Sequence, residues 1–215
     1  MKKIFVLLSG VLLLCLSAGA RADVPDPDVL IKNTVHEVLD IVRADKDLRA
    51  GDQKKMLELV DAKVLPHFNF ERMTRLAVGK AWRTASPEQK QALMTEFRIL
   101  LVRTYTKAFT SYRDQVVEIK PFKLDAAATE VTVKTAIVKP GSQQTILVDY
   151  DLEKTPNGWK VFDMTVEGVD LVASKRGEFA DYIQQSGVDG LIKKLSELNH
   201  SAAATAALAE KAGSK

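Results

Sequence analysis

The chain has 215 residues, with 31 lysines and arginines against 28 aspartates and glutamates. Three of the basic residues and none of the acidic ones lie in residues 1–22, so residues 23–215 carry 31 − 3 = 28 basic and 28 acidic side chains. This balance argues against nucleic acid and against an anionic membrane surface as partners. The single cysteine also lies in residues 1–22, which excludes disulfide and thiolate chemistry from the remainder.

The first 22 residues have the three parts of a secretory signal peptide. Two lysines precede an apolar run over residues 4–16, and Ala20-Arg21-Ala22 supplies small residues before a cleavage point ahead of Asp23. The apolar run is shorter than the roughly 20 residues that a membrane-spanning helix needs. We therefore expect the leader to be cleaved and the mature chain to be exported.

Helical patterns dominate the amino-terminal half. Pro27 behind Asp26 predicts the start of a first helix. Its apolar residues recur at helical spacing: Ile31, Val35, Val38, Leu39 and Val42. A second helix is predicted over residues 52–64, and a short third one after Asn69 as its cap. The sequence Ser86-Pro87-Glu88-Gln89 has the pattern of a capping box and predicts the longest helix.

Apolar residues then alternate with polar ones, which predicts strands over residues 117–119, 131–138, 145–152 and 159–166. The short turns between the last three strands imply antiparallel neighbours. The alternation is only approximate in Gly158 to Val172, where apolar side chains crowd both faces. One stretch therefore carries more apolar surface than a half-buried strand needs.

Two helices are predicted to close the domain, over residues 175–185 and after Asp189, with Gly187 as a left-handed cap between them. The alanine-rich residues 200–215 predict a disordered tail. The expected fold is α+β, a single domain over residues 23–199. In it a four-stranded antiparallel curved sheet packs against helices and encloses an apolar pocket.

The sequence offers little for metal binding or catalysis. His36, His67 and His200 are isolated from one another, so no metal site is expected. The nucleophile pattern G-x-S-x-G and glycine-rich phosphate loops are absent from the sequence. Acid–base chemistry would use Asp149 or Asp163 with Tyr150, because apolar neighbours raise a carboxyl pKa.

The most unusual feature is the breadth of apolar residues on the longest helix and on the last two strands. Each one alone is explained by ordinary core packing, but facing apolar sets together predict a cavity. The candidate cavity residues are Phe97, Tyr105, Phe109, Ile146, Val148, Tyr150, Phe162, Met164, Val166, Val169 and Leu171.

Six segments occur in a consistent order, and their succession is more specific than any one of them. They are Pro66 to Met73, Trp82 to Gln89, Thr104-Tyr105, Trp159 to Met164, Glu167 to Val172 and Gly187 to Leu191. Together they resemble the MlaC family of periplasmic phospholipid-binding proteins, also described as toluene-tolerance or ABC-transporter auxiliary proteins. The resemblance covers about residues 28–199. At Asp170 and Lys175 the chain departs from the family pattern.

The resemblance implies a fold like that of nuclear transport factor 2 (NTF2) and a non-enzymatic, monomeric carrier in a Gram-negative periplasm. Such a carrier holds the acyl chains of a glycerophospholipid in its pocket and needs no cofactor. It moves lipid between an outer-membrane lipoprotein complex and the MCE-domain subunit of an inner-membrane ABC transporter, which maintains outer-membrane lipid asymmetry. The eleven candidates above then become lipid-binding residues.

Two alternatives stay open at this point. One is an exported NTF2-like enzyme that uses Asp149, Asp163 and Tyr150. The other is a ligand-free periplasmic adaptor.

Overall fold

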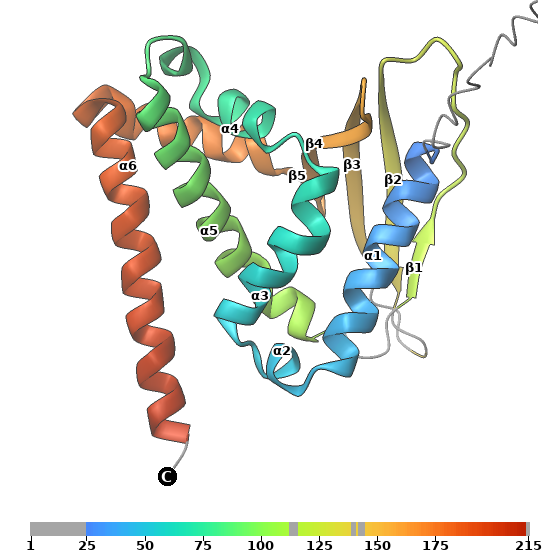
Figure 1. The fold of residues 1–215 in the computed structure, drawn as a ribbon, viewed down its shortest axis with the longest axis horizontal. Coiled ribbons are helices and arrows are strands. Elements are labelled where there is room, and N and C mark those ends of the chain that lie inside the picture. The colour runs from blue at the N-terminus through green and yellow to red at the C-terminus, as the bar shows by residue number, and fades with distance from the viewer. Residues whose placement is uncertain (1–24, 112–115, 139–140, 142–144, 214–215) are drawn as a thin grey trace, which may run out of the picture.

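The computed structural model describes residues 25–111, 116–138, 141 and 145–213, with side chains over 25–105, 116–138, 141 and 145–201. The predicted leader, residues 1–22, lies outside the described residues. The sheet and helix α1 lie at one side of the molecule, and the long helices α5 and α6 lie at the other (Figure 1).

The predicted amino-terminal helices are confirmed. They are α1 (Pro27–Ala44), α3 (Gln53–Leu59) with the π-helical turn η1 (Val60–Val64), and α4 (Phe70–Val78), joined by the 3-10 turn η2 (Leu65–His67). Asn69 caps α4, because its side-chain oxygen accepts the N–H of Arg72 at 3.0 Å. The sequence patterns did not predict the five-residue helix α2 (Lys46–Ala50).

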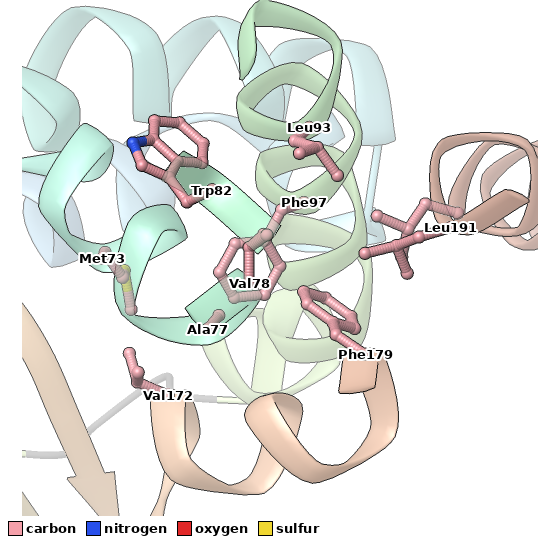
Figure 2. Packing of buried hydrophobic residues seen from close by; sticks show 10 residues of the cluster. Met73, Ala77, Val78, Trp82, Leu93, Phe97, Val172, Phe179 and Leu191 are labelled. Atoms are coloured by element: carbon pink, nitrogen blue, oxygen red, sulfur yellow. The ribbon is translucent and has the colours of Figure 1, made fainter. Parts of the chain in front are cut away.

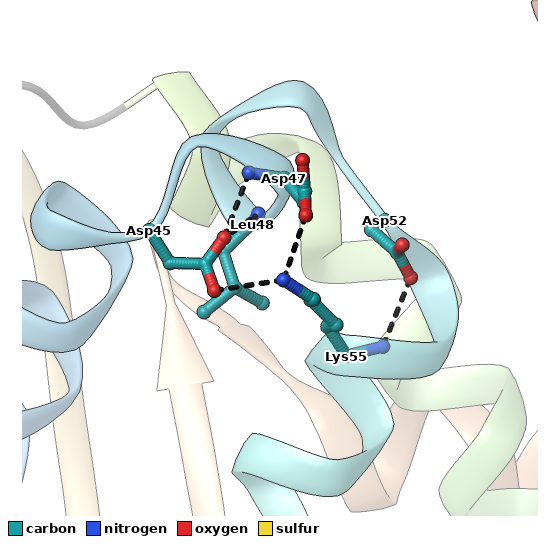
Figure 3. A network of polar contacts seen from close by, with 5 residues as sticks. All are labelled: Asp45, Asp47, Leu48, Asp52 and Lys55. Atoms are coloured by element: carbon teal, nitrogen blue, oxygen red, sulfur yellow. Dashed lines mark hydrogen bonds and ion pairs between the residues drawn. The ribbon is translucent and has the colours of Figure 1, made fainter.

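Polar contacts fix the corner that contains α2 (Figure 3). Asp45 accepts the backbone N–H groups of Asp47 at 2.7 Å and Leu48 at 3.1 Å. Lys55 of α3 donates to the carboxylates of Asp45 at 3.0 Å and Asp47 at 2.7 Å. The hydrogen bond from Lys55 is the main cause that lowers the pKa of Asp45. The corner therefore reverses the chain between α1 and α3.

The capping box of the longest helix, α5 (Pro87–Ser111), is confirmed. The Ser86 hydroxyl accepts the N–H of Gln89 at 3.2 Å, and the Gln89 side chain accepts the N–H of Ser86 at 2.9 Å. A 3-10 turn, η3 (Gly79–Arg83), connects α4 to this cap. The start of α5 is thus set by local hydrogen bonds.

The sheet has five antiparallel strands in the order β1-β2-β3-β4-β5, rather than the predicted four. They are β1 (Val116–Ile119), β2 (Glu130–Val138), β3 (Thr145–Thr155), β4 (Gly158–Val166) and β5 (Val169–Asp170). The added strand β5 pairs with the end of β4 through a tight turn, in which Glu167 and Gly168 have φ of 50° and 79°. Two residues are too few to form an alternating pattern, so β5 could not be predicted from the alternation of apolar residues.

A β-bulge in β4 explains the approximate alternation. Asp151 of β3 faces Asp163, and the next residue, Leu152, faces Val161, which leaves Phe162 as an extra residue. The side of β4 that faces the helices therefore passes from odd-numbered to even-numbered residues at this point. Trp159 and Val161 face the helices before the bulge, and Met164 faces them after it.

The last helix, α6 (Leu171–Gly213), is interrupted at Gly187, where φ is 69° and ψ is −173°. The prediction of two closing helices that meet at Gly187 is therefore confirmed. The backbone of α6 extends into residues 200–213, within the segment for which the sequence predicts a disordered tail. The division into leader, domain and tail stays a prediction.

A closed hydrophobic core joins α4, α5 and α6 (Figure 2). Phe97 of α5 lies at its centre, with its ring 5.8 Å from that of Phe70 and 5.3 Å from that of Phe179 in an edge-on arrangement. A second cluster lies between α1 and the sheet and includes Ile31, Val133 and Leu152. Within the described part of the chain, no helix is both long and apolar enough to cross a bilayer.

Candidate functional site

A cavity of ≈ 220 Å³ lies between the sheet and the helices, with α1 and α5 among the helices that line it. Its walls are almost entirely apolar. The helical wall includes Ile31, Val35, Val38, Leu39, Met56, Val60, Val64, Leu101, Val102 and Tyr105, and the sheet wall includes Ile137, Ile146, Val148, Tyr150, Val161, Met164 and Val166. An apolar space of this kind suits hydrocarbon and has little to offer a polar ligand.

Seven of the predicted cavity residues lie in its walls. They are Tyr105, Ile146, Val148, Tyr150, Met164, Val166 and Leu171. The three from β3 alternate regularly along that strand, so the period-2 pattern located them correctly. The side chain of Phe109, another predicted residue, lies outside the described side chains.

The structure places three other candidates away from the cavity. Phe97 is fully buried in the closed core between α5 and α6. Phe162 is the extra residue of the β4 bulge, and the guanidinium carbon of Arg72 lies 3.6 Å from the centre of its ring. Val169 lies in β5 with 54% of its surface exposed. These three therefore lie outside the walls of this cavity.

Sequence reasoning missed the contribution of the first helices. Four members of the predicted apolar stripe on α1 line the cavity, namely Ile31, Val35, Val38 and Leu39. The turn η1 adds Val60 and Val64. The stripe itself was visible in the sequence, but a stripe that lines a cavity has the same spacing as one that packs in a core.

Few polar groups reach the cavity walls. Burial is the main cause that lowers the pKa of His67 and that raises the pKa of Tyr105, so both side chains stay neutral near pH 7. Arg98 of α5 also lines the cavity and forms an ion pair with Asp61 of η1. The site can thus exclude water from an apolar ligand over most of its surface.

The residues of the alternative acid–base set are not brought together. Tyr150 faces the cavity, whereas Asp149 is on the opposite face of β3, 3.6 Å from the ammonium group of Lys134. Asp163 lies beside Asp151 of the adjacent strand β3. It accepts the backbone N–H groups of Met164 at 2.7 Å and of Val172 at 3.3 Å. Its carboxylate thus holds the start of α6 against β4.

Burial is the main cause that raises the pKa of Asp163 from its ordinary 3.8 to about 6, with Asp170 and Asp151 adding to the effect. Because the folded pKa lies above the unfolded one, the stabilising effect of protonation is fully present below pH 3.8 and is lost as pH rises through about 6. The pH window for this group is therefore about 4 to 6.

We expect Asp163→Asn to remove this part of the pH dependence. The free energy of unfolding of the parent protein, relative to the variant, should rise by about 1 kcal/mol between pH 7 and pH 4.5, after allowance for solvent screening. Urea unfolding of both proteins at the two pH values measures the difference. An identical pH dependence in the two proteins would contradict the assignment.

Among the described residues, no cluster of three or more histidine, cysteine or acidic side chains is arranged to hold a metal ion.

Known proteins are similar to this chain over most of its length. The family model described as MlaC protein matches residues 32–197. The chain is 23% identical over 199 residues to the intermembrane phospholipid transport system binding protein MlaC of Haemophilus influenzae, covering 92% of this chain and 93% of that protein. It is 26% identical over 192 residues to the toluene tolerance protein ttg2D of Pseudomonas putida, covering 86% and 83%.

A solved structure is also similar. The phospholipid-binding protein of Ralstonia solanacearum, in complex with a phospholipid, superposes with a TM-score of 0.79 at 39% sequence identity. The match covers 83% of this chain and 99% of that one.

Proposed function

The chain belongs to the MlaC family, and from this we propose that it is a periplasmic carrier that holds the acyl chains of a glycerophospholipid in the cavity between its helices and its sheet. The observation that carries the proposal is the apolar wall of that cavity, to which β3, β4, α1 and α5 all contribute. A phospholipid in the Ralstonia solanacearum protein, at 39% identity, supports it.

The energetic need for such a cavity is large. At about 0.8 kcal/mol per buried CH₂ group, two chains of about sixteen carbons would cost on the order of 20 kcal/mol to hold exposed in water. A carrier that crosses an aqueous compartment must therefore cover both chains. Many weak apolar contacts achieve this, which agrees with a wall that contains few polar groups.

The transport route follows from the family in the same way. We propose that the leader directs the chain to the periplasm, where the monomeric carrier moves lipid between an outer-membrane lipoprotein complex and the MCE-domain subunit of an inner-membrane ABC transporter. The described side chains offer no local chemical step for release. Docking to a membrane complex would then open the cavity, and ATP hydrolysis by the transporter would supply the direction.

Lipid analysis of the purified protein tests the proposal. Extraction with organic solvent is expected to recover intact diacyl phospholipid in stoichiometric amount, with head groups that follow the composition of the host membrane. An empty protein would favour the ligand-free adaptor. Recovery of lysolipid and free fatty acid after incubation with pure phospholipid would favour the enzyme.

A further inference from the structure

The cavity wall contains one side chain with a permanent charge among the residues that the structure describes. This is Arg98, whose side chain is 27% exposed and which pairs with Asp61, 45% exposed. The exposed carboxylate shows that this part of the wall borders on water. A permanent charge next to hydrocarbon is costly unless a polar partner stays within reach.

The partner of Arg98 lies on an uncommon element. Asp61 belongs to the π-helical turn η1, in which Val60 and Val64 line the same cavity. Single π-helical turns are rare and are frequent at functional sites. The turn thus combines two apolar side chains in the cavity wall with one carboxylate that pairs with Arg98, the one permanently charged side chain in the described part of that wall.

This ion pair is suited to exchange. Ion pairs at this level of exposure contribute about 0–1 kcal/mol, so an incoming anion loses little by displacing Asp61. A phosphodiester carries one negative charge and two free oxygens, which match the paired N–H groups of a guanidinium. When acyl chains fill an apolar cavity, the phosphate that follows them must stay at the border with water.

We propose that Arg98 binds the phosphate group of the carried lipid in place of Asp61. The inference rests on the proposed function and adds to it the position of the polar part of the ligand. Because the phosphate is common to glycerophospholipids, Arg98 distinguishes lipids with a phosphate from neutral diacyl lipids and does not distinguish one head group from another.

Binding of three lipids with identical chains tests the inference on the delipidated protein. The lipids are dioleoyl phosphatidylethanolamine, dioleoyl phosphatidylglycerol and dioleoylglycerol, which has no phosphate. Arg98→Gln is expected to weaken the binding of both phospholipids by roughly tenfold and to leave the affinity for dioleoylglycerol unchanged. Asp61→Asn, which removes the competing carboxylate, is expected to strengthen the binding of both phospholipids.

The matched control is Lys63→Gln, on the same turn. Lys63 pairs with Glu37 and does not line the cavity, so its loss is expected to change none of the three affinities. Arg98→Lys serves where the glutamine variant does not fold, because it keeps the charge and loses the paired N–H geometry. Its phospholipid affinities should fall between those of the parent and a tenfold loss.

Three results would overturn the inference. One is an equal loss for all three lipids in a folded Arg98→Gln protein, which would make Arg98 a structural residue. Another is unchanged affinity for both phospholipids. The third is Arg98-dependent binding of inorganic phosphate that does not compete with either phospholipid, which would assign Arg98 to a separate anion site. None of these three results contradicts the proposed carrier function if the parent protein binds lipid. If the parent protein binds none of the three lipids, the carrier function itself is wrong.

Discussion

Replacing Val148 by glutamate is expected to abolish phospholipid binding. Val148 is 4% exposed, lies in the middle of the sheet wall, and has Thr135 and Val166 as its neighbours on the adjacent strands. A carboxyl group at this position would lose its hydration when acyl chains enter, at a cost of several kcal/mol. In the empty cavity water can reach the new side chain, so the variant is expected to fold.

The matched control is the same substitution at Val169, which is exposed and outside the cavity. Native mass spectrometry of both purified variants measures lipid per protein chain, and circular dichroism checks the fold. We expect no lipid on the Val148 variant and normal lipid on the Val169 variant. Equal lipid content in the two would contradict the assignment of the cavity as the lipid site. Ile146→Glu, in the half-buried part of the same wall, tests the same point if the Val148 variant unfolds.

Phe97→Ala is expected to have the largest effect on stability, a loss of about 3–5 kcal/mol. The ring is fully buried and contacts both Phe70 and Phe179, so truncation leaves a hole at the point where α4, α5 and α6 meet. Phe97 does not line the cavity, so folded variant protein should still carry lipid. Urea unfolding measures the first effect, and solvent extraction measures the second.

Phe162→Ala provides the comparison for this variant. Phe162 lies in the β4 bulge and its main described contact is the guanidinium of Arg72, so its loss is expected to cost about 1 kcal/mol. A similar loss of stability in the two variants would show that Phe97 is not at the centre of the core. Loss of lipid from folded Phe97→Ala protein would return that residue to the candidate site.

Local signals were enough to predict most of the fold. Asn69 and the box that begins at Ser86 set the starts of α4 and α5 with hydrogen bonds to residues three positions away, which a sequence shows directly. Helix α2 has local signals of the same kind, since Asp45 accepts the N–H of Leu48 and Gly51 ends the helix in the left-handed region. Its five residues are too few to show a helical period, so these signals did not stand out in the sequence.

The cavity wall was predicted at all three candidate positions of β3 and at two of three on β4, where Phe162 is the exception for a physical reason. Strict alternation holds along β3, so Ile146, Val148 and Tyr150 share a face. The bulge at Phe162 shifts the alternation of β4 by one residue. The position of a bulge depends on how β4 pairs with β3, which the pattern of one strand alone does not show. On α5 the apolar stripe serves two surfaces, with Phe97 in the closed core and Tyr105 at the cavity.

The position of Phe97 in the closed core, and not at the cavity, has a consequence for the empty state of the protein. The cluster around Phe97 holds α4, α5 and α6 together and shares part of its edge with the cavity, where Phe70, Met73 and Leu101 belong to both. Under the proposed function the carrier returns empty after each delivery, and a chain whose only core was its ligand site would lose its structure on that return. Here Leu93, Phe97 and Phe179 pack together without lining the cavity, so this part of the core does not depend on a bound ligand.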